Sequence, residues 1–273
     1  MTTAAPVYTI RRQRRQRTVP TWLLGLLGLA GLITLIELAP RLGLVDRRFL
    51  PPFSEMMSDL ADQLTTASFW QALGDTLQGW SVGLAIAMIA GVGFGIAIGG
   101  IPTLRAATSS TTEFLRPIPS VALIPLAVLL YGTNMRATLL LVVYAAFWQV
   151  LVQVLYGVQD VDPVARETAH SYRFSPWRQV RTVIWPTALP YVMTGFRLAA
   201  AVALVLEITG ELIIGTPGIG KLIAVAQTSG AYAAMYALVI VAGLIGVVVN
   251  VVARGLERRV LRWHPSVRRE APR

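Results

Sequence analysis

The sequence predicts an all-α integral membrane protein with six transmembrane helices and with both termini in the cytoplasm. Hydrophobic residues make up 55% of the 273 positions and charged residues only 14%, a balance too apolar for a soluble domain of this size. Nearly uncharged windows recur along the chain, each close to the ~20 residues that a helix needs to cross a bilayer. Most of the arginines lie between these windows. Together these observations indicate repeated membrane crossings.

Six windows are long enough to span the membrane, and each must be helical because its backbone has to satisfy its own hydrogen bonds within lipid. The predicted spans are 22–39, 76–104, 117–135, 137–159, 182–206 and 222–253. The only charged residues within the first and fifth spans before their ends are Glu37 and Arg197. We expect a basic cytoplasmic tail at 1–20, the first span and an external loop at 21–71, a transmembrane core at 72–254, and a second basic cytoplasmic tail at 255–273.

The distribution of basic residues sets the orientation. The net charge is +10, and Lys221 is the only lysine among the 24 basic residues. With a cytoplasmic amino terminus, 18 arginines lie on the inner side and five basic residues lie outside, in agreement with the positive-inside rule. The arginines then anchor helices at the membrane surface. We therefore expect a multi-pass protein of a bacterial-type cell membrane that contacts lipid and binds no nucleic acid.

Catalytic chemistry has few residues to draw on. The chain has no cysteine, and its two histidines, His170 and His264, both fall on the predicted cytoplasmic side. An integral membrane enzyme would need a nucleophile–base or metal-binding constellation, and none is evident. We expect a non-catalytic chain that binds no metal and no cofactor of its own.

Small residues recur every four positions in the second predicted span. They are Gly79, Gly83, Ala87, Gly91, Gly95 and Gly99. Such a ridge lets two helix backbones approach closely within a membrane. Two interpretations follow: a helix-packing ridge, which we favour, or a glycine-lined conduit for a solute.

The cytoplasmic loop at 160–190 is unusually ordered for a connection between two spans. Asp162 followed by Pro163 is a strong helix start, and Ser175 followed by Pro176 repeats the signal. The first helix, expected from 163 to about 174, is too short and too polar to cross the membrane. Because a plain connection can be far shorter, we expect this loop to dock another protein.

The same loop carries a family resemblance. Permease subunits of ATP-binding-cassette importers have the pattern E-A-A, three residues, G, then nine residues and I-x-L-P. Here the pattern is matched by Glu167, Thr168 and Ala169, then Arg173 in place of the glycine, then Val183, Trp185 and Pro186. The stretches "LRPIPSVALIPLAVLLYGT" at 115–133, "LPYVMTGFRLAAAVAL" at 189–204 and "GELIIGTPGIGKLI" at 210–223 resemble the nitrate, sulfonate and taurine permeases.

The resemblance implies a binding-protein-dependent importer permease of the type I fold. Its partners would be a second permease copy, two cytoplasmic ATPase subunits that bind ATP and Mg, and an external solute-binding protein. The loop would be the helix that couples to the ATPase, through Asp162, Pro163, Arg166, Glu167, Thr168, Ala169, His170, Arg173 and Pro186. Arginine adopts the left-handed conformation less easily than glycine. We therefore expect the turn at Arg173 to be rebuilt, with the arginine contacting an acidic patch on the ATPase.

The resemblance also suggests the class of solute. The nitrate, sulfonate and taurine branch imports small anions, so an anion is the expected cargo. Related permeases carry thiamine-precursor pyrimidines, riboflavin or aromatic acids, which remain alternatives. From another class, an ion-coupled secondary transporter would favour inverted repeats, and the sequence shows none.

The stretch "GTPGIGKL" at 215–222 almost matches the phosphate-binding pattern G-x-x-x-x-G-K-[ST]. Its last position is leucine, it follows an apolar helix instead of a strand, and it faces outward in the predicted topology. We interpret it as a helix stop and a tight outer turn between the fifth and sixth spans, because its glycines and proline disfavour regular helix.

Four further residues are candidates for the translocation path or its gate. Glu207 and Glu211 lie four residues apart, hence on one helix face, and ionisable groups inside a membrane are functional candidates. Bonding of Glu211 to the glycine-rich turn is an alternative to such a role. Pro119 and Pro125 interrupt the third predicted span, and irregular backbone at membrane depth commonly lines a cavity or a partner helix.

Overall fold

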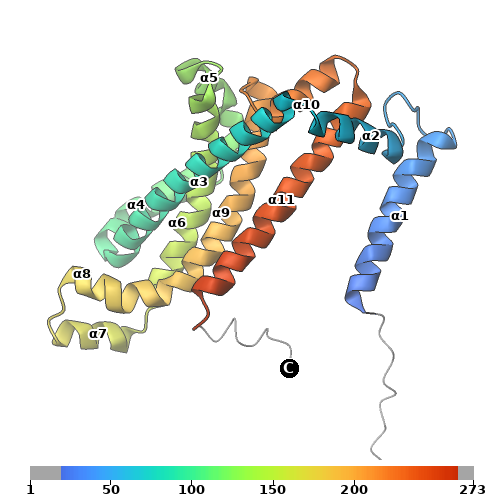
Figure 1. The fold of residues 1–273 in the computed structure, drawn as a ribbon. Coiled ribbons are helices and arrows are strands. Elements are labelled where there is room, and N and C mark those ends of the chain that lie inside the picture. Colours follow the sequence, from blue (N-terminus) through green and yellow to red (C-terminus); the bar gives the residue numbers. More distant parts are fainter. Residues whose placement is uncertain (1–19, 264–273) are drawn as a thin grey trace, which may run out of the picture. The chain divides into compact units, whose positions relative to one another are not determined.

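The computed structural model describes residues 20–263, and every secondary-structure element within that range is helical. Most of both predicted basic tails, and His264, lie outside the described residues. The chain divides into two compact units, 1–54 and 55–273, which are described separately. Figure 1 shows the helices in the colours of the sequence.

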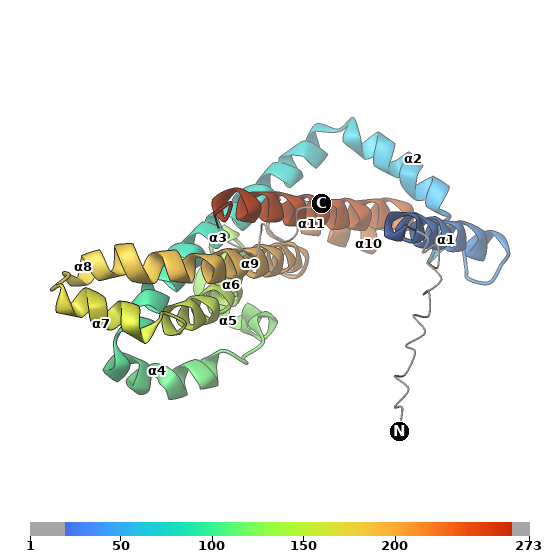
Figure 2. The ribbon, with the colours of Figure 1, turned by 90° about the horizontal axis from the view of Figure 1, so that it is seen from below.

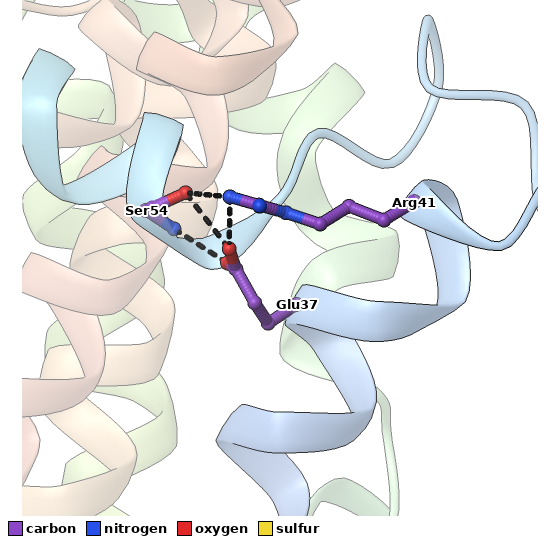
Figure 3. Close-up of polar contacts among 3 residues, drawn as sticks. All are labelled: Glu37, Arg41 and Ser54. Carbon is purple, nitrogen blue, oxygen red and sulfur yellow. Dashed lines mark hydrogen bonds and ion pairs between the residues drawn. The ribbon is translucent and has the colours of Figure 1, made fainter.

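The first unit is dominated by α1 (Thr21–Arg41), an apolar helix with a mean hydropathy of 2.0 whose apolar window has no buried residue. Near its end, Glu37 accepts hydrogen bonds from the backbone N–H and the hydroxyl of Ser54, at 2.9 and 3.0 Å. Arg41 forms an ion pair with the same carboxylate and donates to the Ser54 hydroxyl at 3.2 Å (Figure 3). The charge near the end of the first predicted span is therefore fully engaged within the unit.

The second unit holds the remaining helices, including all but the first two residues of α2. In chain order they are α2 (Phe53–Leu64), α3 (Ala67–Gly100), α4 (Pro102–Leu115), the 3-10 turn η1 (Ser120–Leu123), α5 (Ile124–Tyr131), α6 (Met135–Gln159), α7 (Pro163–Ser171), α8 (Pro176–Gln179), the π-helical turn η2 (Val180–Ile184), α9 (Trp185–Ile214), α10 (Ile219–Thr228) and α11 (Tyr232–Val260). Within this unit, α7 and α8 lie at one end and α10 at the other (Figure 1). Figure 2 shows α7 and α8 side by side from a second direction.

The predicted first and fourth spans agree with α1 and α6, the second and fifth overlap α3 and α9 with shifted ends, and the third and sixth differ more. Four single helices of the described chain are long and apolar enough to cross a membrane, and the number rises to six if each of two bent pairs counts as one span. The third predicted span, 117–135, is wrong as a single helix. The structure instead pairs α4 with the segment Ser120–Tyr131 at an angle of 84°. A hydropathy window reports composition and not helix boundaries. It therefore misses that α5 is only eight residues long, about 12 Å, and that Gly132 with a φ of 71° separates it from α6.

The sixth predicted span is also wrong at its start. Residues 222–228 belong to α10, which ends at Thr228, and the long helix α11 begins only at Tyr232. Gly230 separates the two helices and has a φ of 75°. The apolar composition continues across this break, so a hydropathy window merges two helices into one.

The core of the second unit lies where α3, α6 and α9 pack together. Its fully buried side chains include Leu141 and Val142 on α6 and Ala199 and Ala203 on α9. A smaller apolar cluster forms at the α10 end and includes Phe69, Ala72, Ile219, Ile223, Leu238 and Val241. The three central helices therefore form the scaffold on which the candidate sites are placed.

Candidate functional site

The loop at 160–190 folds as a helical hairpin with both predicted helix starts in place. The Asp162 carboxylate accepts a hydrogen bond from the N–H of Val164 at 2.8 Å, which caps α7. The Ser175 hydroxyl accepts from the N–H of Arg178 at 3.4 Å, which caps α8. Pro163 and Pro176 occupy first-turn positions, where a missing N–H costs nothing. The sequence signals for both helix starts are confirmed.

Arg173 occupies the turn at the end of α7 with a φ of 52°, and it is the only non-glycine residue of the described chain with positive φ. Its N–H donates to the carbonyl of His170 at 2.8 Å, and the N–H of Phe174 donates to the carbonyl of Ala169 at 3.0 Å. This pair of bonds is the Schellman motif, which usually has glycine at the position of Arg173. The expectation of a rebuilt turn is wrong, since the arginine adopts the left-handed conformation that glycine would take.

The hairpin exposes a mixed charged and aromatic surface. Glu167, Thr168, His170 and Arg173 are exposed, whereas Ala169 is buried. Three large apolar side chains of the hairpin are exposed to solvent: Val164 at 68%, Tyr172 at 75% and Trp177 at 74%. The sequence motifs above did not identify them. The aromatic letters in "SYRFSPW" were the available signal. Exposed aromatics beside charges are typical of a protein-docking surface.

Two contacts fix the hairpin to the helices beside it. Arg166 donates from its guanidinium to the carbonyl of Val158, near the end of α6, at 3.0 Å. Tyr191 on α9 donates to the carboxylate of Asp160 at 2.9 Å. Pro186 directly follows the π-helical turn η2 in a continuous helical run, where its missing N–H removes one helical hydrogen bond. The hairpin is therefore tied to both α6 and α9.

The "GTPGIGKL" stretch contains the predicted helix stop, followed by a new helix. Gly215 ends α9 with a φ of 83°, and Gly218 immediately precedes α10. Gly220 and Lys221 lie inside α10 and are not part of the turn, which corrects the predicted extent of the turn. Gly220 is needed there for close packing, because a Cβ at this position would overlap the carbonyl oxygen of Ile208.

Glu211 is fully buried and caps the start of α10. Its Oε2 accepts a hydrogen bond from the N–H of Gly220 at 2.8 Å. The Thr76 hydroxyl on α3 accepts from the N–H of Ile219 at 2.9 Å, so two helices supply acceptors to the amides of α10. A carboxylate beside a helix amino terminus also interacts favourably with the helix dipole. Glu211 thus bonds to a glycine amide of the 215–222 stretch, as the alternative expected, although this amide lies in α10 and not in the turn.

Glu207 lies one turn earlier on α9 and is 3% exposed. A Cβ placed on Gly79 of α3 would overlap its carboxylate, so the glycine makes room for this side chain. One oxygen, Oε2, is buried and has no hydrogen-bond partner among the described residues. The two acidic residues thus differ: Glu211 caps a helix, and Glu207 borders a small pocket.

Arg197, the basic residue within the predicted fifth span, pairs with an acid that the sequence reasoning did not consider. Its guanidinium lies 3.2 Å from the carboxylate of Glu257 on α11. The two residues are 60 positions apart, so no local pattern could have connected them.

The prolines of the predicted third span begin helices and do not break one. Pro119 precedes η1, and Pro125 lies in the first turn of α5. An apolar groove of about 710 Å³ opens beside them, between the α4–α5 region and α6. It is lined by Leu115, Ile118, Leu123, Leu126, Tyr131, Arg136, Leu139, Leu140, Val143, Tyr144 and Phe147.

The small-residue ridge of α3 lies against a row of valines on α6. A Cβ on any of four ridge glycines would come within 2.5–2.9 Å of a valine side chain. The facing pairs are Gly83 with Val142, Gly91 with Val150, Gly95 with Val154, and Gly99 with Val158. Side chains therefore fill the space beside these glycines, which is the geometry of helix packing and not of an open conduit.

Known proteins share both the sequence and the fold of this chain. Residues 83–262 match the family described as binding-protein-dependent transport system inner membrane component. The taurine transport system permease protein TauC of Escherichia coli K12 is 31% identical over 234 residues, covering 83% of this chain and 84% of TauC. The nitrate import permease protein NrtB of Leptolyngbya laminosa is 27% identical over 193 residues, covering 71% of this chain and 69% of NrtB.

Solved structures show the same helical arrangement at lower sequence identity. A chain of the inward-facing MetNI methionine ABC transporter superposes with a TM-score of 0.62 at 17% identity, covering 71% of this chain and 96% of that chain. The family match and the identity to TauC show the family of this chain. The apolar helices described above are those of a protein that crosses a membrane several times. The chain is therefore a multi-pass membrane protein that belongs to the family of binding-protein-dependent transport system inner membrane components.

Proposed function

We propose that this chain is the membrane-spanning, non-catalytic subunit of an ATP-driven importer, and that the α7–α8 hairpin is where a cytoplasmic ATPase binds. The observation that carries the proposal is the hairpin itself, within the residues that match the family. It is capped at both helix starts, tied to α6 and α9, and exposes Glu167 and Arg173 beside Tyr172 and Trp177. ATP and Mg belong to the partner in this proposal.

The proposed topology has six spans with both termini in the cytoplasm. In it, α4 and α5 together form one bent span that includes Arg105 and Arg116, and α9 crosses from the hairpin to the outer turn at Gly215. The hairpin and α10 lie at opposite ends of the second unit, which supports their assignment to opposite sides of the membrane (Figure 1). The excess of arginine in the segments assigned to the inner side supports the same orientation.

The proposed cargo is a small organic or inorganic anion, delivered by an external binding protein. The support is the similarity to permeases named for taurine and nitrate. A second permease copy completes the importer, and we assign to it the apolar groove between the α4–α5 region and α6. In this arrangement Pro119 and Pro125 lie at the boundary between the two copies and border the translocation path.

Charge reversal at Glu167 tests the ATPase-binding role. The importer would be assembled in proteoliposomes with the ATPase and binding protein that co-purify with this chain, and ATP hydrolysis stimulated by the loaded binding protein would be measured. The Glu167→Arg variant is expected to lose at least tenfold of this stimulated activity while remaining folded in the membrane. The matched control is Asp62→Arg, an exposed carboxylate on α2. Equal activity of Glu167→Arg and wild type would refute the assignment.

Accessibility to an impermeant reagent tests the topology, because the chain has no cysteine of its own. A single thiol introduced by Lys221→Cys is expected to react from outside intact cells. A single thiol introduced by His170→Cys is expected to react only after the cells are permeabilised. The reverse pattern would overturn the proposed orientation.

A further inference from the structure

A small pocket lies at the α10 end of the second unit, between α3, the start of α6, α9 and the outer turn. Its volume is about 80 Å³. It is lined by Asp75, Gln78, Met135, Glu207, Thr216 and Pro217. Glu207 and Thr216 are buried and form its floor, whereas Asp75, Gln78 and Pro217 are exposed at its mouth. The pocket is thus open to a ligand at one side and closed by polar groups at the other.

Glu207, which lines the pocket, carries a buried acceptor oxygen that the chain itself does not use. Glu207 is 97% buried, and its Oε2 has no hydrogen-bond partner in the described part of the chain. The Thr216 hydroxyl is engaged with that of Thr138 at 3.0 Å, and Glu211 accepts from Gly220 through Oε2, while Glu211 Oε1 is also buried without a partner among the described residues. A buried carboxylate oxygen without a donor is unfavourable, so a donor from outside the chain would be bound there with a gain in free energy.

The charge of the pocket indicates which donor fits. Its lining includes two carboxylates, Asp75 and Glu207, and no basic side chain. A metal ion would need more protein ligands, and the described residues contain no group of three histidine, cysteine, aspartate or glutamate side chains suited to a metal. A primary ammonium group carries one positive charge and three N–H donors. The volume accommodates about two or three groups the size of a water molecule, enough for an ammonium and the carbon attached to it.

We propose that this pocket, with Glu207 at its floor and Asp75 at its mouth, binds the primary ammonium group of a zwitterionic solute. The inference rests on the proposed importer function and narrows its solute class to small amino-substituted anions, of which an aminoalkanesulfonate is the type. Inorganic anions such as nitrate have no group that this pocket binds. The pocket then acts as a specificity-determining subsite at the outer end of the chain.

Thiol labelling at the mouth of the pocket tests the proposal without the partner proteins. The Gln78→Cys variant supplies the only thiol of the full-length chain, which would be purified in detergent. The rate of reaction is compared for aminoethyl methanethiosulfonate, a cation, and sulfonatoethyl methanethiosulfonate, an anion. The reference is Ser229→Cys, an exposed site at the end of α10 that does not line the pocket. Relative to that reference, the pocket is expected to favour the cationic reagent at least tenfold.

Two further substitutions, each combined with Gln78→Cys, separate the effect of the pocket carboxylates on the labelling rates from that of the other charges of the protein. Glu207→Gln is expected to reduce the preference for the cation at least fivefold. Asp75→Asn, at an exposed position, is expected to reduce it about twofold, and it serves if Glu207→Gln fails to fold. An unchanged preference in Asp75→Asn and in folded Glu207→Gln would overturn the proposal.

Protection by small probes completes the test. Taurine and ethylammonium, each at millimolar concentration, are expected to slow labelling of the introduced thiol at least threefold, whereas ethanesulfonate leaves it unchanged. Protection by ethanesulfonate alone would refute an ammonium site. Because the measurement uses neither the ATPase nor a binding protein, its failure leaves the importer proposal standing. If instead the Glu167→Arg test fails, the labelling rates still decide whether the pocket binds an ammonium group.

Discussion

Two short helices at opposite ends of the second unit, α7 and α10, are built with the same devices. Each begins with a carboxylate that accepts a backbone N–H at 2.8 Å: Asp162 accepts from Val164 in α7, and Glu211 accepts from Gly220 in α10. Each ends in a Schellman motif. At the end of α10, the N–H of Gly230 donates to Gln227 at 3.2 Å and the N–H of Ala231 donates to Ala226 at 2.9 Å, matching the two bonds around Arg173.

The difference between the two helices lies in where their parts come from and what they expose. The cap of α10 comes from another helix, α9, and is fully buried, and the turn that ends α10 has glycine with a φ of 75°. The cap of α7 is local and exposed, and its turn has arginine with a φ of 52°. A left-handed conformation costs a side-chain-bearing residue about 1–2 kcal/mol. The cap and turn of α10 therefore carry no left-handed strain on a side-chain-bearing residue. The turn of α7 carries that strain and exposes the charged side chain of Arg173.

The largest expected effect is at the buried cap. Glu211→Ala removes the acceptor of the Gly220 N–H in a site that water does not reach, and it leaves a void among α3, α9 and α10. We expect a loss of about 3 kcal/mol in the free energy of unfolding, measured by thermal or denaturant unfolding in detergent. The control is Glu211→Gln, which keeps one acceptor oxygen and should lose less. A loss below about 1 kcal/mol for Glu211→Ala would contradict the role of the cap.

The next effect is at the glycine turn of α10. Gly230→Val forces a β-branched residue into a positive φ and is expected to cost about 2 kcal/mol, seen as a lower melting temperature. The matched control is Gly243→Val on α11, where a Cβ likewise meets nothing within 4 Å but φ is negative. Equal melting temperatures for the two variants would show that the left-handed turn is not maintained.

A smaller effect is expected at the exposed cap of α7. Asp162→Ala removes one hydrogen bond at a helix start that faces solvent, at a cost of about 1 kcal/mol. Because α7 is a short peripheral helix, the loss should appear as faster amide hydrogen exchange in residues 163–171 and not in α10. Faster exchange in both helices would show that the two ends of the unit are not independent.

The smallest effect on stability, and the sharpest test of the comparison, is at the arginine turn. Arg173→Gly relieves the left-handed strain, so we expect stability to be unchanged or to rise by less than about 1 kcal/mol. Stimulated ATP hydrolysis by the assembled importer is expected to fall severalfold, since the charged side chain is lost from the proposed docking surface. If activity is retained in full, then the arginine has no role there.

The sequence predicted the features that depend on neighbouring residues. Both helix starts of the hairpin follow from Asp162-Pro163 and Ser175-Pro176, and the ridge on α3 follows from a four-residue repeat. The fourth predicted span coincides with α6 to within two residues at its start and ends at the same residue. In each case a local pattern contains all the physical information that the structure uses.

The features that sequence reasoning missed depend on distant partners or on backbone direction. Glu207 faces Gly79, and Arg197 pairs with Glu257, across more than fifty intervening residues in each case. The 84° bend between α4 and the segment after it is a change of backbone direction, which a hydropathy window does not report. Arg173 was expected to avoid the left-handed conformation, yet the two hydrogen bonds around it outweigh the strain of a single residue.

The length of α9 has a mechanical consequence. This helix runs for 30 residues, about 45 Å, from the hairpin side at Trp185 to Ile214, with Pro190 within it. A rod of that length, tilted by about 10° around one end, displaces the other end by about 8 Å. Glu211 and Gly220 join its far end to α10, so in the proposed importer a tilt of this size applied at the hairpin end would displace α10 by a similar distance.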